Sequence, residues 1–280
     1  MASELGDART VDERPFPPGL QTSATLGPRE TRVHDHAIAV PSHWWDDELK
    51  AHGFADETFT AADSVLTRRD LFELGSRASD DAGAARRLLW ATLAWGTGKR
   101  HRNNRARIAS LGDDPDGIGK KLAGAAALAR NDAGAAYRAM MPGGRNLVAY
   151  LGPPFFTKFL YFAGAGDPAH PCLILDSVVA QALARLEGAS AWEPLGTRYW
   201  WPSSTYVEYT RVLHRWAREV SDARHESIAA DQLERWLFLP ASEPSLSVFG
   251  ETPRASGFGL QGMTGDQSRD QQQPVGRGIW

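Results

Sequence analysis

Apolar side chains recur at helical spacing through the middle of this chain, and this pattern constrains its fold more than any other feature. The clearest stripe has a large apolar residue at every third or fourth position: Tyr206, Tyr209, Leu213, Trp216 and Val220. Such a stripe forms the apolar face of a helix that packs on a core. No alternating strand pattern and no internal repeat stands out in the sequence. The sequence therefore predicts an all-α fold.

Helix start signals divide the same region into separate elements. Ser42 can cap a first helix, and Thr67 and Asp70 form the pattern of a capping box for a second. Further helices are expected, in chain order, over 81–95, 116–130, 132–141, 146–151 and 231–237.

The two ends of the chain have a different composition. Residues 1–40 are rich in Gly, Pro, Ser, Thr and charge, residues 241–280 are similarly polar, and neither end has a sustained apolar period. Both compositions are typical of disordered segments. We therefore expect a disordered N-terminal tail (1–40), one helical domain (41–240) and a disordered C-terminal tail (241–280).

Composition limits the class of protein. The chain has 280 residues, 42% of them hydrophobic, which is enough for one sizeable core. It has no apolar run that could span a bilayer, and its N-terminus lacks the apolar centre of a signal peptide. A single cysteine, Cys172, excludes an internal disulfide and a four-cysteine iron–sulfur cluster. We expect a cytoplasmic monomer with no membrane partner, no metal and no other cofactor.

The net charge of −3 gives no general attraction to nucleic acid. DNA binding would therefore need a local basic patch, and the densest positive run contains Lys99, Arg100, Arg102, Arg105 and Arg107. The run follows a Gly-Thr-Gly sequence, a natural loop at a groove. The alternative interpretation is a solvated basic face on an amphipathic helix.

Lys158 and Asp176 are the strongest candidates for chemistry. The lysine lies in the first turn of an apolar helix, and the aspartate opens the next helix after a Gly/Pro loop and a short apolar run. An ionised aspartate can stabilise positive charge that develops during a reaction, and a lysine amine can act as a nucleophile that forms a Schiff base. The simpler interpretation is that Asp176 only caps a helix and that Lys158 is a solvated surface residue.

The stretch that carries this pair resembles the helix-hairpin-helix DNA glycosylases, and most closely their 8-oxoguanine DNA glycosylase branch. Residues 146–151 would form the first hairpin helix and residues 152–156 the tight turn, with Lys158 in the register of the family's Thr-Lys pair. The resemblance implies a two-lobed helical fold without the N-terminal β domain of the eukaryotic enzymes. It also implies that Lys158 and Asp176 are the catalytic residues. The ionised aspartate would stabilise the positive charge that develops on the sugar when the N-glycosidic bond breaks, and the lysine amine would displace the base and form a Schiff base at C1′.

The hairpin turn of this family binds a DNA phosphate through backbone N–H groups, assisted by the dipole of the second helix. The resemblance therefore implies DNA contacts at Gly152 and Thr157. In this chain Pro154 and Phe156 stand where the family has glycines. Proline fits the first turn of a helix but has no N–H to donate.

A second stretch, Asn-Asn-Arg-Ala-Arg-Ile at 103–108, is similar to the Asn-Asn-Ile-Ala-Arg-Ile stretch of the same branch. In that family an asparagine from this stretch fills the gap left by the flipped nucleotide, and an arginine reads the opposite base. Arg107 matches the arginine, and Arg102 stands in the place of the inserted asparagine. The DNA contacts expected from this stretch are Arg102, Asn103, Asn104, Arg105 and Arg107.

A flipped base is held between flat side chains. Phe155 and Phe156 at the hairpin are candidates for this role, as are Trp200 and Trp201 in an expected loop. The alternative is that these rings are core, as most tryptophans in a helical protein are.

These features predict a DNA glycosylase that flips a modified base out of double-stranded DNA and excises it, with or without AP lyase activity. The base expected from the resemblance is 8-oxoguanine, and a bulky or hypermodified phage base is the other candidate. Such an enzyme would act at the nucleoid, in DNA repair or in anti-phage defence. The alternative from another class is a non-catalytic helix-hairpin-helix DNA-binding module, and a further one is a helical scaffold that binds no DNA.

Overall fold

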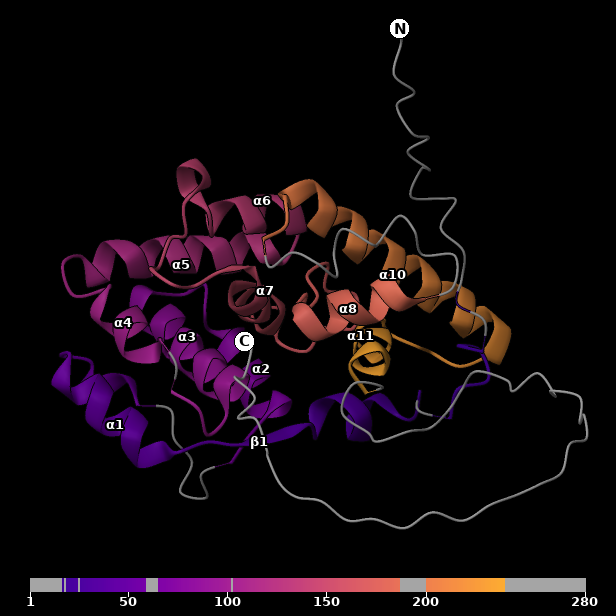
Figure 1. The fold of residues 1–280 in the computed structure, drawn as a ribbon, viewed down its shortest axis with the longest axis horizontal. Helices are drawn as coiled ribbons and strands as arrows, with labels where there is room; N and C mark the ends of the chain where they lie inside the picture. The colour runs from indigo at the N-terminus through magenta and orange to yellow at the C-terminus, as the bar shows by residue number, and fades with distance from the viewer. Residues whose placement is uncertain are drawn as a thin grey trace, which may run out of the picture. The chain divides into compact units, whose positions relative to one another are not determined.

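Figure 1 shows the computed structural model of this chain. The structure describes residues 17–239, apart from residues 18, 25, 59–64, 102 and 187–199. The chain divides into two units, residues 1–245 and 246–280, and every described residue lies in the first. Arg102 and the expected C-terminal tail are outside the described residues.

The described residues are mostly helical, which confirms the all-α prediction. The helices are η2 (Glu30–His34), α1 (Ser42–Ala51), η3 (Ala55–Glu57), α2 (Arg68–Ser76), α3 (Ala82–Thr97), α4 (Asn104–Ala109), α5 (Pro115–Ala129), α6 (Ala133–Ala139), η4 (Pro142–Gly144), α7 (Pro153–Phe162), α8 (Ser177–Arg185), α10 (Ser203–Arg224) and α11 (Ala230–Phe238). A short antiparallel ribbon joins β1 (Ala37–Ala39) to β2 (Val65–Thr67), with Ile38 opposite Leu66. This ribbon was not expected, because three-residue strands are too short to show an alternating pattern.

Side-chain caps explain where several helices begin. The capping box before α2 is confirmed, since Thr67 Oγ1 accepts from the Asp70 N–H and Asp70 accepts from the Thr67 N–H. Asp81 caps α3 in the same way through the Ala84 N–H. Ser42 is not a cap, because it is the first residue of α1 and follows Pro41.

Helix α7 lies among α2, α3, α5 and α6 and is seen almost end-on in Figure 1. Its sequence is apolar on all sides, which is typical of a helix that packs on every face. Pro153 and Pro154 occupy its first turn, where their missing N–H groups have no intrahelical acceptor in any case. Lys158 is therefore the only charged residue of a helix that packs within the core.

The expected helix over 146–151 is absent, and this prediction was wrong. Pro142 is followed by Gly143 and Gly144, whose φ angles of 61° and 79° turn the backbone out of a helical path. The chain then returns to the end of α6, where the Leu147 N–H donates to the Met140 carbonyl at 2.9 Å. The element before α7 is thus a loop with buried apolar anchors, not the first helix of a hairpin.

The boundary expected at residue 40 also needs correction. Within the segment 17–40, Leu20, Leu26 and Val33 are buried in the core, and η2 and β1 form. Their spacing is irregular, so no period marked them in the sequence. The guanidinium of Arg29 also donates to both carboxylate oxygens of Asp231 in α11, at 2.7–3.2 Å.

A buried polar network fixes α11 against α2 and α7. The guanidinium of Arg68 donates to both oxygens of Glu234, at 2.9 and 3.3 Å, and to the Tyr161 hydroxyl at 3.2 Å. Tyr161 in turn donates to Asp231 at 2.9 Å. Because buried charges are costly unless they are paired, this network specifies how the three helices pack.

Candidate catalytic site at the start of helix α7

Lys158 and Asp176 form a direct, largely buried ion pair. Lys158 Nζ donates to Asp176 Oδ2 at 2.7 Å, and the two side chains are 9% and 12% exposed. The same amine donates to the Pro154 carbonyl, one helical turn earlier, at 2.9 Å. The fold thus brings together two groups that are 18 residues apart in the sequence.

Asp176 also caps helix α8. Its Oδ1 accepts from the Val178 and Val179 N–H groups at 3.0 and 3.1 Å, while Oδ2 accepts from Lys158. Burial opposes ionisation of this carboxyl, but the lysine charge and these N–H donors outweigh it and lower the pKa of Asp176. Capping and pairing therefore use different oxygens of one carboxylate that stays ionised.

Thr157 sets the spacing between the two elements that carry this pair. Its buried hydroxyl accepts from the Leu175 N–H at 3.2 Å and lies 2.8 Å from the Pro153 carbonyl, to which it donates. It thereby joins α7 to the residue that precedes Asp176. The structure gives the Thr157 side chain this internal position, and Gly152 lies just before α7 as its N-cap.

Gly96 and Phe155 border the Lys158 side chain. The Phe155 ring centroid is 6.0 Å from Lys158 Nζ. A Cβ atom on Gly96 would lie 3.3 Å from Phe155 Cε1 and 3.4 Å from Lys158 Cδ. The helix expected over 81–95 would stop just before Gly96, whereas α3 continues past it and leaves room there for both side chains.

The residues expected to contact DNA from 103–108 are in different environments. Asn104 and Arg107 are buried and bonded to each other, with Arg107 Nη1 donating to Asn104 Oδ1 at 2.7 Å. Burial lowers the pKa of Arg107 to about 10. Arg105 is 72% exposed but donates to both oxygens of Glu48 at 2.8 Å, and Asn103 is exposed.

The four aromatic candidates for a base pocket differ in how far they are buried. Phe156 is fully buried and packs edge-on against Tyr137, and Trp201 is buried in the core. Trp200 is 46% exposed. Phe155 is half-buried, and its ring centroid lies 6.0 Å from Lys158 Nζ.

A further cluster of aromatic rings begins at Phe162, on the same helix as Lys158. Phe162, one turn beyond the lysine, contacts Trp95 with ring centroids 5.4 Å apart, and Trp95 contacts His36 at 5.0 Å. His36 is 6.2 Å from Phe238 at the end of α11. Sequence reasoning missed His36 because it lay in the expected tail.

Arg235 borders this cluster with its guanidinium carbon 5.2 Å from the Phe238 ring centroid. Its Nε and Nη1 atoms are buried and have no acceptor among the described residues. Burial and the nearby Arg68 lower the pKa of Arg235 to about 10. Burial and Arg68 also lower the pKa of His36 to about 2, so the imidazole is neutral at physiological pH. The cluster therefore places the rings of His36, Trp95 and Phe238 near two donor atoms that have no acceptor among the described residues.

Within the part of the chain that the structure describes, no group of three or more His, Cys, Asp and Glu side chains could hold a metal ion. No helix there is long and apolar enough to cross a lipid bilayer.

The described residues thus form a helical domain that buries a lysine–aspartate pair at the start of α7. Residues 31–238 match the family described as "Putative 8-oxoguanine DNA glycosylase OGG-like protein". The match covers more than half of the chain, so the chain belongs to this family and the family resemblance is confirmed. It begins within η2, in agreement with a domain that starts before residue 41. Searches of curated proteins and of solved structures gave no match.

Proposed function

We propose that this protein excises a modified base from duplex DNA, with Lys158 as nucleophile and Asp176 as the group that stabilises charge on the sugar. The observation that supports this most directly is the buried Nζ–Oδ2 contact of 2.7 Å. A lysine that served only solubility would not be buried against a helix cap. Displacement of the base by a lysine requires this combination of an amine and an ionised carboxylate at one sugar carbon.

The proposed reaction begins with departure of the base. The base leaves with the electron pair of the N-glycosidic bond, and positive charge develops on C1′ and the ring oxygen. The carboxylate of Asp176, ionised because of its lowered pKa, stabilises that charge. The Lys158 ammonium gives up a proton, the departing base takes one up, and the free amine bonds to C1′.

An AP lyase step follows from the same intermediate. Opening of the sugar ring converts the amine adduct into a Schiff base, in which Lys158 is doubly bonded to C1′. The iminium makes the neighbouring C2′ proton acidic, and its removal expels the 3′ phosphate. Hydrolysis of the iminium then returns the free lysine.

The cluster of His36, Trp95 and Phe238 is the proposed binding site for the flipped base. Flat rings suit a nucleobase, and the unused N–H groups of Arg235 suit a base edge with acceptor atoms. 8-Oxoguanine has two carbonyl oxygens, so it is the first substrate to test. A bulky or hypermodified phage base with acceptors on the same edge is the second.

Borohydride trapping on a panel of modified duplexes tests this function. Wild-type protein should form a covalent complex with the duplex that carries its substrate base, and Lys158→Gln should form none. Lys121→Gln is the matched control, because Lys121 is an exposed lysine of α5. A covalent complex that persists in Lys158→Gln would overturn the assignment of the nucleophile. DNA binding without excision or trapping on any duplex would indicate a non-catalytic DNA-binding module.

A further inference from the structure

Tyr150 has an unusual position in the loop that precedes α7. It is 61% exposed, more than any other large apolar side chain in the described part of the protein. Its φ angle is 61°, in the left-handed region that residues with a side chain rarely adopt. The flanking Val148 and Leu151 are buried. The loop is therefore anchored on both sides of a tyrosine that projects into solvent.

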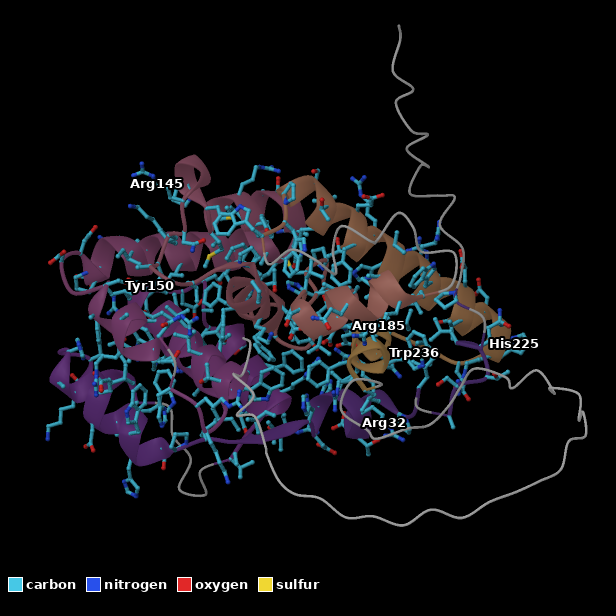
Figure 2. All side chains as sticks on the ribbon, in the orientation of Figure 1. Arg32, Arg145, Tyr150, Arg185, His225 and Trp236 are labelled. Carbon is cyan, nitrogen blue, oxygen red and sulfur yellow. The ribbon has the colours of Figure 1, made fainter. Side chains whose placement is uncertain are left out.

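Three buried or half-buried side chains hold the backbone of Tyr150 in place. Arg107 Nε donates to the Tyr150 carbonyl at 3.0 Å, and Arg107 Nη1 donates to Asn104 Oδ1. Asn104 in turn donates to Thr97 Oγ1 at 3.0 Å. Figure 2 labels Tyr150 close to α4, the helix that carries Asn104 and Arg107. Two residues expected to contact DNA thus use their polar groups inside the protein to hold the Tyr150 carbonyl.

Tyr150 is also connected to the candidate catalytic site. The Arg107 guanidinium carbon lies 4.0 Å from the Phe155 ring centroid, and that centroid lies 6.0 Å from Lys158 Nζ. A sugar that reaches Lys158 must bring the rest of its duplex against the residues around this site. Tyr150 places an exposed aromatic ring at that boundary, on a backbone held by Arg107.

We propose that Tyr150 is the wedge residue of this protein: its ring enters the duplex next to the flipped nucleotide and stacks on the bases that have lost their neighbour. Aromatic rings stack on any base, and a wedge between base steps stabilises an opened duplex. Asn104 and Arg107 are buried and cannot fill the gap as they stand. Their hydrogen bonds position Tyr150 to fill it instead. This inference rests on the proposed function.

The test compares variants that remove or keep the ring. Tyr150→Gly removes the ring and relieves the φ of 61°, so it leaves the fold intact. Tyr150→Phe keeps the ring. Leu128→Ala is the matched control, because Leu128 is another exposed large apolar side chain, on α5, and has no proposed role in binding or catalysis. Each protein is mixed with a substrate duplex that carries 2-aminopurine beside the modified base, and fluorescence and single-turnover excision are recorded.

We expect Tyr150→Gly to slow duplex excision by about 10-fold or more and to lose the 2-aminopurine change, because stacking on one base contributes that order of affinity. Tyr150→Phe and Leu128→Ala should behave like wild type. Unchanged duplex excision and fluorescence in Tyr150→Gly would overturn the wedge.

Single-stranded abasic DNA separates this result from failure of the proposed function, since it needs no flipping. Tyr150→Gly should form the borohydride-trapped complex with it at the wild-type level. A parallel loss of trapping in Tyr150→Gly would show that the variant damages the chemistry and would overturn the wedge. If wild-type protein forms no trapped complex with abasic DNA, that result would instead contradict the proposed function, and the wedge proposal that rests on it.

Discussion

Asp176 directs one carboxylate oxygen to Lys158 and the other to the backbone N–H groups that begin α8. The aspartate can therefore lose its charge without losing its capping oxygen. This separation makes the ionic and the structural contributions of the residue measurable in a single substitution.

Asp176→Asn should reduce single-turnover excision by about 10²-fold, the scale seen when a positioned charge is removed from a catalytic site. The amide oxygen still caps α8, but the lysine charge is left without its ionic partner. The free energy of unfolding should therefore fall by about 3 kcal/mol. Excision rate and thermal midpoint are measured on the same sample.

Asp81→Asn is the matched control for this substitution, because Asp81 caps α3 and has no lysine partner among the described contacts. It should retain wild-type excision. Near-normal excision by folded Asp176→Asn would show that Asp176 only caps α8.

Thr157→Val should separate positioning from chemistry. Valine keeps the shape of the side chain but leaves the buried Leu175 N–H without an acceptor, which should lower stability by about 1–3 kcal/mol. Because Thr157 sets the spacing of the ion pair, excision should slow by about 10-fold while substrate binding stays unchanged. Thr210→Val is the control, since among the described residues the Thr210 hydroxyl donates to a carbonyl of its own helix and to no other element. An unchanged excision rate in Thr157→Val would contradict the positioning role.

The sequence predicted the features that depend on local pattern. The stripe from Tyr206 to Val220 lies on helix α10, and Thr67 and Asp70 form the capping box of α2. Both features depend on residues within one or two turns of each other. The pairing of Lys158 with Asp176 could be predicted as well, since a lysine and a helix cap at this spacing resemble a family motif, and their catalytic role stays a prediction.

Features that depend on tertiary contacts could not be predicted in this way. Nothing local indicates that Leu20 is buried or that Phe156 faces Tyr137 while its neighbour Phe155 faces Lys158. The polarity of Arg107 likewise predicts exposure, whereas a carbonyl supplied by a distant loop allows it to be buried.

Gly96→Ala should affect activity more than stability. Alanine favours a helix by up to about 1 kcal/mol over glycine, but its methyl group would press on Phe155 and on the stem of Lys158. We expect trapping with abasic DNA to slow by about 10-fold with no loss of thermal stability. Gly124→Ala, in open space on α5, is the control and should trap normally. Equal trapping rates in both variants would show that the space at Gly96 is not needed.

His36 should contribute a pH dependence to stability. Its pKa is lowered to about 2 in the folded protein by burial and by Arg68, whereas an unfolded histidine titrates near 6.5. The unfolded state therefore binds more protons as the pH falls below about 6.5, and stability should decrease by up to about 1.4 kcal/mol per pH unit for this residue. Urea denaturation between pH 7 and about pH 4.5 should show a shallower decline in His36→Gln than in wild type. Identical declines would show that His36 is not buried in the neutral form.

Removal of residues 1–40 should unfold the protein, whereas removal of residues 1–16 and 241–280 should not. A chain of residues 41–240 loses the buried side chains of Leu20, Leu26 and Val33, each of which contributes about 1.5–3 kcal/mol. It also leaves Asp231 without Arg29. The loss from the three side chains alone approaches the whole stability of a typical domain, about 5–15 kcal/mol. Circular dichroism and urea denaturation of chains 17–240 and 41–240 decide the matter. Cooperative unfolding of chain 41–240 at the wild-type midpoint would show that the N-terminal segment is dispensable for the fold.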